Sequence, residues 1–297
     1  MTLAADSETS SGRSADSWLA AAKTLLRQRS NQAFRDFRLA VRPIYALYAR
    51  GPNRRLQHGR TAVLLRIDGR AVMVTAAHVL DPISSGIPMF TSGPVGTHPV
   101  EIKGRIQATP LPAGGRHHDH VDSAFWEMPD DVVAALGGVR FVESWRISQN
   151  KAPIERRYYM AMGYAISRNK GAIDHAARGT GNRISRYSGS VVEIPALAAE
   201  LGTSGANHMF LSFEKRAHSE DDAPVDTFGP KGLSGGPLLD LGDFVSEAAY
   251  SADAMHQASL SGILIAHKKK HKAIVAMKMG PIVASIRKYL QTPPAQE

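Results

Sequence analysis

The chain has 297 residues, 36 Lys+Arg against 27 Asp+Glu for a net charge of +9, and no cysteine, so disulfides, thiol nucleophiles, cysteine-ligated zinc and iron–sulfur clusters are excluded. Apolar residues make up 43% and charged residues 21%, a globular composition that can bury a core without cross-links. Any nucleophilic chemistry must therefore use Ser, Thr, Lys, His or a carboxylate, and a cysteine-free chain fits a reducing compartment.

The first 14 residues are rich in Ser and Thr and are predicted to form a disordered tail. They lack a basic segment followed by an apolar stretch, so they do not resemble a secretory signal. No window of the chain approaches the roughly 18 apolar residues of a membrane-spanning helix. We therefore expect a cytoplasmic protein with no membrane partner. Asp16 suits the N-cap of a helix through Trp18 and Leu26, within a helical extension over residues 15–41.

Beyond Pro43 the pattern changes to short β-prone segments punctuated by Gly and Pro. Asp68-Gly69, between the β-prone runs 61–67 and 70–75, predicts a two-residue hairpin turn, because both central residues of that turn need positive φ. Further strands are predicted at 44–48, 100–106, 121–126, 158–163, 188–194, 209–213, 237–239, 260–266 and 273–279.

Helical patterns are expected in two later places. Residues 240–258 are expected to carry a helical insertion, and Pro281 with the apolar face that follows it predicts a C-terminal helix over 281–290. Residues 165–208 are Gly-rich and irregular. Many short strands with a single terminal helix predict an all-β barrel or sandwich architecture.

Three segments combine residue types that carry chemistry. His78 follows Thr-Ala-Ala at the end of the hairpin's second strand, Asp122 leads into an apolar strand, and Ser234 lies within Gly-Leu-Ser-Gly-Gly-Pro. A serine hydroxyl is a weak nucleophile until a nearby base accepts its proton, and histidine suits that task near neutral pH. A carboxylate fixes the imidazole tautomer, and glycines let backbone N–H groups point at a developing oxyanion.

These segments resemble the three signature blocks of trypsin-like (chymotrypsin-fold) serine peptidases. The blocks are Thr75-Ala-Ala-His78, Asp122-Ser-Ala-Phe125 and Gly232-Leu-Ser-Gly-Gly-Pro237. The resemblance implies two packed six-stranded antiparallel β-barrels, a first over residues 42–145 and a second over 146–297 that includes the C-terminal helix. It implies that the active site lies between the barrels, with His78 and Asp122 on the first and Ser234 on the second. It also implies an oxyanion hole from the backbone N–H groups of Gly232 and Ser234.

Leu233 departs from the animal digestive members of the family, which have Asp at this position to pair with a new N-terminus after zymogen cleavage. A leucine cannot make that ion pair, so the chain is more similar to the bacterial, cysteine-free branch that includes the HtrA-like proteases. No PDZ domain is expected, since the sequence closes just after the terminal helix.

The resemblance also implies a substrate site. Phe228, six residues before the nucleophile, would lie at the base of the pocket for the P1 residue, and Ile265, Ala266 and His267 would pair with the substrate backbone. An apolar base predicts a small or aliphatic P1 residue. Asp226 lies two residues from Phe228, and a loop shift that brought it into the pocket would restore a basic preference.

Several other charged or polar residues have an alternative interpretation. Asp119 lies three residues before Asp122 and is the alternative orienting carboxylate. The cluster 117–120, His-His-Asp-His, contains imidazoles that suit a metal, but adjacent residues in a polar loop favour solvation, so no metal and no cofactor is expected. The basic run 267–272 between two strands favours a solvated hairpin tip, and no nucleic-acid partner is expected because no aromatic residues interleave the basic ones.

The sequence therefore predicts a serine endopeptidase that cleaves a protein or peptide substrate through an acyl-enzyme, in regulated, stress-related or defence-related proteolysis. Two alternatives stay open. One is a pseudoprotease that binds a partner through the cleft, and the other is a latent enzyme whose oxyanion hole forms only with an activating partner protein.

Overall fold

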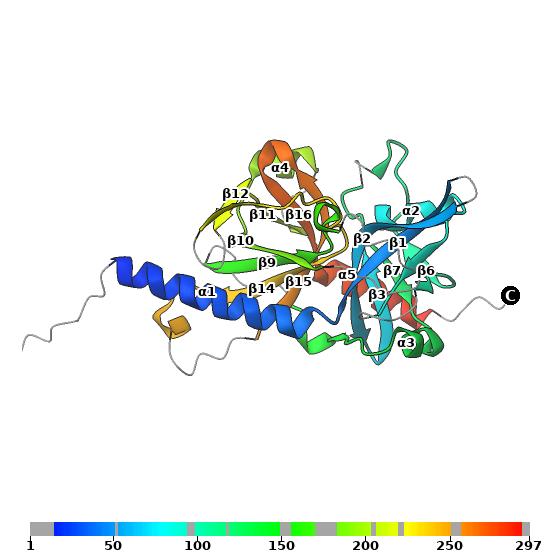
Figure 1. Cartoon of the computed structure of the whole chain (residues 1–297), viewed down its shortest axis with the longest axis horizontal. Helices are drawn as coiled ribbons and strands as arrows, with labels where there is room; N and C mark the ends of the chain where they lie inside the picture. The colour runs from blue at the N-terminus through cyan, green and yellow to red at the C-terminus, as the bar shows by residue number, and fades with distance from the viewer. Residues whose placement is uncertain are drawn as a thin grey trace, which may run out of the picture.

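A computed structural model describes residues 15–50, 53–93, 99–116, 119–148, 156–169, 183–202, 206–218, 223–250 and 257–292. The predicted tail at 1–14 lies outside these residues. Two antiparallel sheets form the body of the molecule, with α1 (Ala15–Phe37) beside one of them and α5 (Met279–Gln291) between them (Figure 1). The all-β class predicted from the sequence is confirmed.

The first sheet lies at the right of Figure 1 and has the strand order β5-β4-β1-β2-β3-β7-β6, with β8 added in parallel to β2. Its strands are β1 (Val41–Arg50), β2 (Asn53–Ile67), β3 (Arg70–Thr75), β4 (Met89–Thr91), β5 (Val100–Glu101), β6 (Ile106–Ala108), β7 (Ala124–Glu127) and β8 (Val142–Glu143). The sheet has eight strands where six were expected. The predicted strand at 100–106 is divided by Gly104, whose φ of 91° is not a strand value, and β8 was not foreseen.

The hairpin between β2 and β3 is confirmed. Asp68 and Gly69 have φ values of 49° and 81°, so both central residues of the turn lie in the left-handed region. The helix α2 (Ala77–Ser84) follows β3 after a single residue, where the sequence predicted only a strand end. The helix α3 (Asp130–Leu136) and the short turn η2 (Ser144–Arg146) complete this half of the molecule.

The second sheet has the order β10-β9-β14-β15-β16-β11. Its strands are β9 (Arg157–Gly163), β10 (Ser185–Ser190), β11 (His208–Ser212), β14 (Pro237–Asp243), β15 (Ser259–Lys268) and β16 (Ala273–Lys278). A bridge between Val191, just beyond β10, and Leu211 on β11 joins the two ends of this order and closes the six strands into a barrel. Short elements decorate it: η3 (Ile166–Arg168), α4 (Pro195–Glu200), β12 (Arg216–His218), β13 (Pro224–Asp226), η4 (Glu247–Tyr250) and η5 (Lys269–His271).

In place of the helical insertion expected at 240–258, the structure describes the end of a strand followed by a single helical turn. Strand β14 continues to Asp243, and only the single turn η4 is helical; residues 251–256 lie outside the described part of the chain. Buried aliphatic residues at Leu239 and Leu241 explain the longer strand, because both are fully enclosed in the core.

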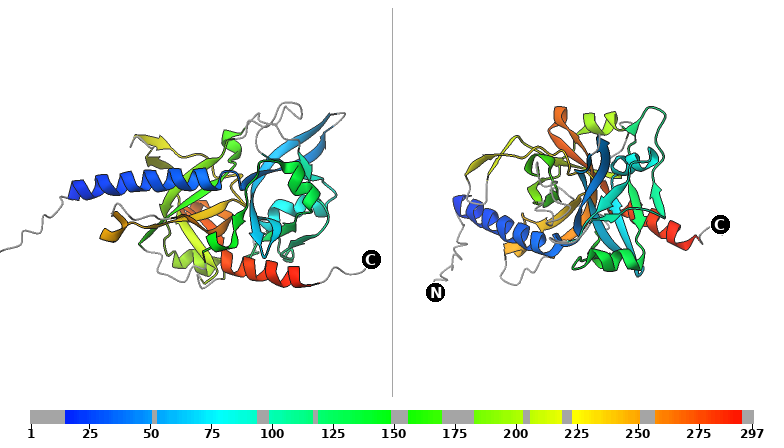
Figure 2. Two further views of the ribbon diagram at one scale, coloured as in Figure 1. Left: turned by 90° about the horizontal axis from the view of Figure 1, so that it is seen from below. Right: turned by 45° about the vertical axis from the view of Figure 1, so that its right-hand side comes forward.

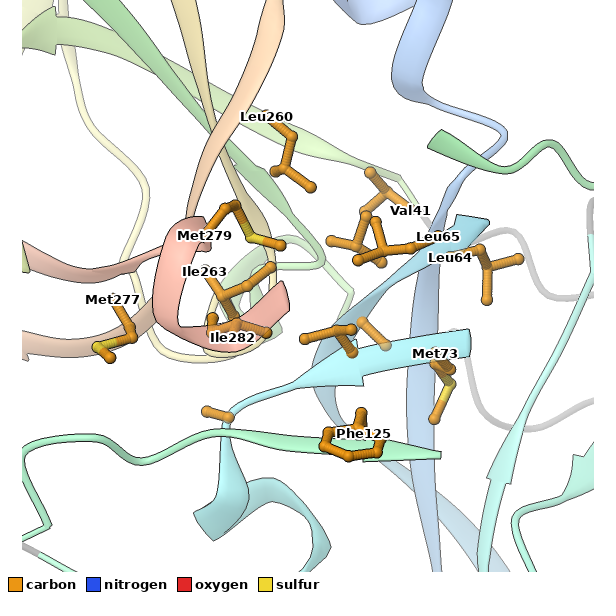
Figure 3. Close-up of a cluster of buried hydrophobic side chains, with 14 of the residues drawn as sticks. Val41, Leu64, Leu65, Met73, Phe125, Leu260, Ile263, Met277, Met279 and Ile282 are labelled. Atoms are coloured by element: carbon orange, nitrogen blue, oxygen red, sulfur yellow. The ribbon is translucent and has the colours of Figure 1, made fainter. Parts of the chain in front are cut away.

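The two sheets share one apolar core. Figure 3 shows Leu65 of β2 on the side of the strand towards Leu260 and Ile263 of β15, with Ile282 of α5 close to Ile263, while Leu64 points to the other side of the strand. All five side chains are at most 2% exposed. Helix α5 contacts β15 and β16 on one side and β2 on the other. Since protein interiors are closely packed, this shared core fixes the position of one sheet relative to the other.

Helix α1 leads into the first sheet but lies along the second (Figures 1 and 2). The guanidinium of Arg29 donates hydrogen bonds to the backbone carbonyls of Leu241 at 3.1 Å, Asp243 at 2.7 Å and Ala249 at 3.2 Å, and it stacks on Phe244. None of the helices in the described ranges is both long enough and apolar enough to cross a membrane.

Candidate active site

His78 and Asp122 are brought together across 44 residues of sequence. The Nδ1 atom of His78 lies 2.7 Å from Oδ2 of Asp122, and the side chains are 22% and 7% exposed. A histidine held in this way presents its other ring nitrogen, Nε2, away from the carboxylate. A carboxylate on Nδ1 fixes the tautomer in which Nε2 can accept a proton.

Asp122 also caps the helix that carries His78. Its Oδ1 atom accepts the His78 backbone N–H at 2.9 Å, and its carbonyl oxygen accepts the Ala77 N–H at 3.1 Å. The residue at the N-cap position, Ala76, has no side chain able to cap. The first turn of α2 is therefore satisfied from a distant loop, and one carboxylate orients both the backbone and the ring of His78.

Asp119, the alternative carboxylate, is engaged elsewhere. Its Oδ1 accepts the backbone N–H groups of Val121 at 3.0 Å and Asp122 at 2.8 Å, and its Oδ2 accepts from Thr109 at 2.7 Å and from Arg116 at 2.6 Å. Asp122 has a φ of 33°, an unusual value for a residue other than glycine. Asp119 thus holds the turn that places Asp122 and makes no contact with the imidazole.

Ser234 lies on a tight turn directly before β14, and this turn is fastened to the first sheet through Thr61 of β2. The Thr61 backbone N–H donates to the Ser234 carbonyl at 3.0 Å, and its hydroxyl donates to the Gly232 carbonyl at 2.8 Å. The same hydroxyl accepts the Tyr164 N–H at 2.9 Å. Thr75, three residues before His78, donates its hydroxyl to the Thr61 carbonyl at 2.8 Å. Thr61 thus connects the serine turn with the strand that leads to the histidine.

Glycines are required in this turn by sterics. Gly232 and Gly235 have φ values of 100° and 85°. A Cβ on Gly232 would lie 2.5 Å from the Tyr164 carbonyl oxygen, and a Cβ on Gly235 would collide with the Thr61 carbonyl and the Thr75 hydroxyl. The close approach of the two sheets at this point therefore depends on residues without side chains.

Two backbone N–H groups of the turn are unused. Among the described residues, no acceptor bonds the N–H of Gly232 or of Ser234, whereas the neighbouring N–H groups of Leu233, Gly235 and Gly236 all donate to carbonyls. Unengaged backbone donors beside a serine are the arrangement that an oxyanion hole requires. Ser234 itself is only partly buried.

Leu233 is 2% exposed and belongs to a buried cluster with Ala165 and Leu264, with Phe228 packed against that cluster. The turn is therefore supported by apolar packing at the position where an acidic residue would need a buried ion-pair partner. A charged group near the pair of His78 and Asp122, called the dyad below, is the guanidinium of Arg60. Burial lowers the pKa of its guanidinium, while the nearby Tyr48 and Asp122 raise it.

The predicted substrate residues gather on β15 and around one aromatic ring. Phe213, which follows β11, packs edge-on against both Phe228 and His267, with ring centroids 6.2 and 5.5 Å away. Ile265 is buried, Ala266 is half-buried and His267 is exposed. The structure thus brings Phe228 and His267 to the same cluster, and Phe213 is a member that the sequence did not suggest.

One edge of β15 is open beside the serine turn. Strand β14 pairs with β15 only as far as Ile263, and the Gly235 N–H then bonds the Leu264 carbonyl at 2.7 Å. Beyond Leu264, no described strand pairs with this side of β15, while β16 pairs with its other side through Lys268. An extended peptide can add to such an edge by backbone hydrogen bonds.

Three other groups of residues that the sequence singled out make different contacts. Asp226 is an exposed residue of the β12–β13 hairpin, in register with Arg216. Within the described residues no three His, Asp or Glu side chains converge as metal ligands; two residues of the cluster 117–120 fall outside that range. In the basic run, Lys268 and His271 contact Glu200 at 3.0 and 3.1 Å.

The sequence missed the residues that fasten the site together. Thr61 and Phe213 lie in ordinary strand patterns with no motif around them. Thr75 and Asp119 lie inside or beside quoted motifs, but nothing in their spacing indicates a hydrogen bond to Thr61 or to the Asp122 backbone. Only the pairing of β2 with β3, which the hairpin predicts, hints that Thr61 and Thr75 are close.

Comparison with models of protein families finds no match, and comparison with curated proteins finds none either. Among solved structures, the chain is similar to a serine endoprotease from Yersinia pestis, at 12% identity and TM-score 0.46, covering 88% of this chain and 66% of that one. It is also similar to the Rv3671c protease from M. tuberculosis in its active form, at 16% identity and TM-score 0.47, covering 91% and 88%. A Glu endopeptidase matches at 12% identity and TM-score 0.45, covering 85% and 90%. The chain thus spans about two thirds of the Yersinia protein. All three neighbours are proteases by name, and at 12–16% identity the function has to be argued from the geometry of the site.

Proposed function

We propose that the chain is a serine endopeptidase that forms an acyl-enzyme on Ser234. The observation that carries this proposal is the 2.7 Å contact between His78 Nδ1 and Asp122 Oδ2, at the start of the helix that follows the strand tied to the serine turn. In the proposed reaction, the Ser234 hydroxyl attacks the scissile carbonyl and its proton passes to His78 Nε2. The resulting imidazolium then protonates the leaving amine, and a water repeats the sequence to release the acid.

The two unengaged N–H groups of Gly232 and Ser234 support the second requirement of this chemistry. They are the donors that would bind the oxyanion of the tetrahedral intermediate. Because they are backbone groups on a turn fixed by Thr61 and by the glycines, they need little reorganisation when charge develops. Loss of one such donor typically costs about 10²- to 10³-fold in kcat.

We propose that the substrate is an extended peptide that adds to the open edge of β15 beside Ala266 and His267. A segment of protein or a peptide can make these backbone hydrogen bonds whatever its sequence, so side-chain pockets must supply specificity. The aromatic cluster of Phe213 and Phe228 supports a preference for small or aliphatic P1 residues. A P1 peptide library is expected to show cleavage after Ala, Val or Leu, and cleavage only after Arg or Lys would contradict this assignment.

A fluorophosphonate probe tests the proposed nucleophile directly, since it phosphonylates only an activated serine. We expect labelling of the wild-type protein and none of Ser234→Ala or His78→Ala. Ser167→Ala is a matched control, because Ser167 is exposed beside the same turn and bonds the Gly229 carbonyl; it should label normally. Full labelling of folded Ser234→Ala would refute the proposal.

A latent form of the same enzyme is the second candidate. One observation favours it: within the described residues, the Ser234 hydroxyl makes no hydrogen bond to His78. Catalytic hydrogen bonds are often long in the absence of substrate and tighten later. Folded wild-type protein that fails to label alone, but labels after addition of cell extract from its source, would indicate an activating partner. The regulated role expected from the sequence stays a prediction.

A further inference from the structure

Arg116 lies at the centre of a polar cluster that the sequence did not single out. Its Nε atom donates to both carboxylate oxygens of Asp81 at 3.0 Å, and its Nη2 atom donates to Asp81 Oδ1 at 2.7 Å. Its Nη1 atom donates to Asp119 Oδ2 at 2.6 Å and to the Thr109 carbonyl at 2.8 Å. The side chain is only 16% exposed. One guanidinium thus binds two carboxylates from different elements.

The two carboxylates lie on the two segments that carry His78 and Asp122. Asp81 lies on α2, three residues after His78, so it occupies the next turn of the same helix. Asp119 accepts the backbone N–H of Asp122 and fixes the turn in which Asp122 has positive φ. Arg116 is therefore a direct bridge between the helix that presents the imidazole and the turn that presents its carboxylate.

The alignment of the dyad depends on the distance between these elements. Helix α2 has no N-cap side chain of its own, and its first two N–H groups are bonded by Asp122. A shift of the turn would thus move both the cap and the carboxylate that contacts His78. A displacement of about 1 Å at a reacting group can cost on the order of 100-fold in rate.

We infer that Arg116 is a positioning residue of the active site, which holds the His78 helix and the Asp122 turn in register through Asp81 and Asp119. The role rests on the proposed function, since positioning matters for catalysis only if the dyad is catalytic. Arg116 touches neither the imidazole nor the Asp122 carboxylate, so it acts only through the elements that carry them.

The electrostatics of the cluster agree with an ionised bridge. The hydrogen bonds that Arg116 donates to Asp81 and Asp119 raise the pKa of its guanidinium, although burial opposes this. Burial alone would raise the pKa of Asp119, but the N–H groups of Asp122 and Val121 and the donors Thr109 and Arg116 lower it below its ordinary value. Both partners are therefore charged at neutral pH.

Lysine cannot replace arginine in this position. A guanidinium is planar and offers five N–H donors in a fixed fork, and Arg116 uses three nitrogen atoms on partners to either side. A lysine ammonium has three N–H donors on one nitrogen atom, so Arg116→Lys keeps the charge but cannot reproduce the fork that reaches Asp81 and Asp119 from separate nitrogen atoms. Arg116→Lys therefore tests the loss of the link between Asp81 and Asp119 at unchanged charge.

The chain offers a matched control in its second sheet. Arg157 donates from Nε to both oxygens of Asp240 at 3.0 and 2.8 Å, with side chains 27% and 6% exposed. This pair resembles the Arg116 pairs in geometry and burial but joins no element of the dyad. Arg157→Lys should therefore reproduce any general loss of stability caused by an Arg-to-Lys change at a half-buried ion pair.

The first measurement is the second-order rate of fluorophosphonate labelling in the full chain. We expect Arg116→Lys to lower it about 10- to 100-fold, and Arg157→Lys to leave it unchanged at similar melting temperatures. In an Asp122→Asn background the same change should have little further effect, because it acts through the dyad. Equal rates for Arg116→Lys and Arg157→Lys, or full additivity with Asp122→Asn, would overturn the inference.

A second measurement does not depend on activity. The Nδ1 proton of His78, assigned in the NMR spectrum by its loss in His78→Gln, reports the hydrogen bond to Asp122. We expect faster exchange of this proton in Arg116→Lys and not in Arg157→Lys. If wild type does not label with the probe, the proposed function fails while this signal still decides the positioning role. Unchanged exchange in Arg116→Lys would overturn that role even in an active enzyme.

Should Arg116→Lys not fold, Asp81→Asn removes only the helix end of the bridge and leaves Asp119 with its remaining donors. The same slower labelling and faster Nδ1 exchange are expected, at smaller amplitude. Wild-type values for folded Asp81→Asn would count against Arg116 as the connection between the two elements.

Discussion

The His78 side and the Ser234 side of the candidate active site are held by different kinds of interaction. In the first sheet, charged side chains make the contacts, since Arg116 and Asp119 fix the turn that presents Asp122. In the second sheet, the backbone of the Ser234 turn makes them, since its carbonyls and N–H groups bond to Thr61 and to β15.

This difference decides how each side can be perturbed. A backbone-built turn with glycines in contact with the neighbouring sheet tolerates no added side chain, but it is insensitive to pH and salt. A charge-built cluster depends on ionisation as well as on geometry, since charge-assisted hydrogen bonds are about twice as strong as neutral ones. Four substitutions separate these behaviours.

Gly235→Ala should have the largest effect. A Cβ at this position would overlap the Thr61 carbonyl and the Thr75 hydroxyl, and Gly235 has a φ of 85°. We expect a loss of about 3–5 kcal/mol in the free energy of unfolding, measured by urea denaturation. Gly280→Ala is the control, because nothing lies within 4 Å of the added atom; it should be neutral or stabilising by up to about 1 kcal/mol. Equal effects would mean that the sheets do not approach as described.

Thr61→Val should be nearly as damaging. The change keeps the shape of the side chain but removes the hydroxyl that donates to the Gly232 carbonyl and accepts the Tyr164 N–H. Two buried backbone groups would lose their partners, at about 2–4 kcal/mol in total. Thr61→Ser retains the hydroxyl and should keep most of the stability and of the probe labelling. If valine and serine behave alike, the hydroxyl does not fasten the turn.

Asp119→Asn tests the charge-built side by its pH dependence. The pKa of Asp119 is lowered in the folded protein, so its ionisation contributes stability above the unfolded-state pKa, and this contribution is lost as pH falls through the folded-state value. At pH 7 we expect wild type to exceed the variant by about 1–3 kcal/mol in free energy of unfolding. The gap should close below about pH 4. A gap that stays constant with pH would show that shape and not charge matters there.

His208 should give the smallest effect, and it connects the two sides. It is 5% exposed on β11, and its Nε2 bonds the backbone carbonyl of His120, two residues before Asp122. Burial lowers the pKa of His208, and the neighbouring His120 and Lys278 add to this, while the hydrogen bond opposes it.

The unfolded chain therefore binds more protons than the folded chain just below about pH 6.5, and stability falls as the pH is lowered through that range. His208→Asn should remove about 1 kcal/mol or less of this acid-dependent loss, measured as unfolding free energy at pH 7 and pH 5. The exposed His218→Asn should retain it. A steeper pH dependence in His208→Asn than in wild type would contradict the sign.

Local patterns were sufficient to predict parts of the fold. Asp68-Gly69 has few alternatives to the tight turn it forms, since a two-residue hairpin needs two positive φ values. Short runs of β-prone residues located β3, β9 and β16 to within a residue or two. The three quoted motifs pointed to His78, Asp122 and Ser234 as a set, and the first two are in contact.

Helix α2 shows why other parts were missed. Sequence signals for a helix start are local, and Ala76 offers none. The cap comes from Asp122 across 44 positions, and no pattern within the segment records it. The same is true of Thr61 and Arg116, whose importance lies entirely in partners brought near by the fold. Residues that hold elements together at long range leave little trace in hydrophobic periodicity or turn chemistry.

Helix α1 has a consequence for the order in which the molecule assembles. The carbonyls that receive the Arg29 guanidinium belong to residues 212, 214 and 220 positions further along the chain. The helix is synthesised before these partners and cannot make the three hydrogen bonds until the chain has been made as far as Ala249. Contacts at such separation close late, because a long loop must be ordered first. Helix α1 is thus secured only after β14 and η4, which carry its partners or lie beside them, are in place, long after the helix itself has been made.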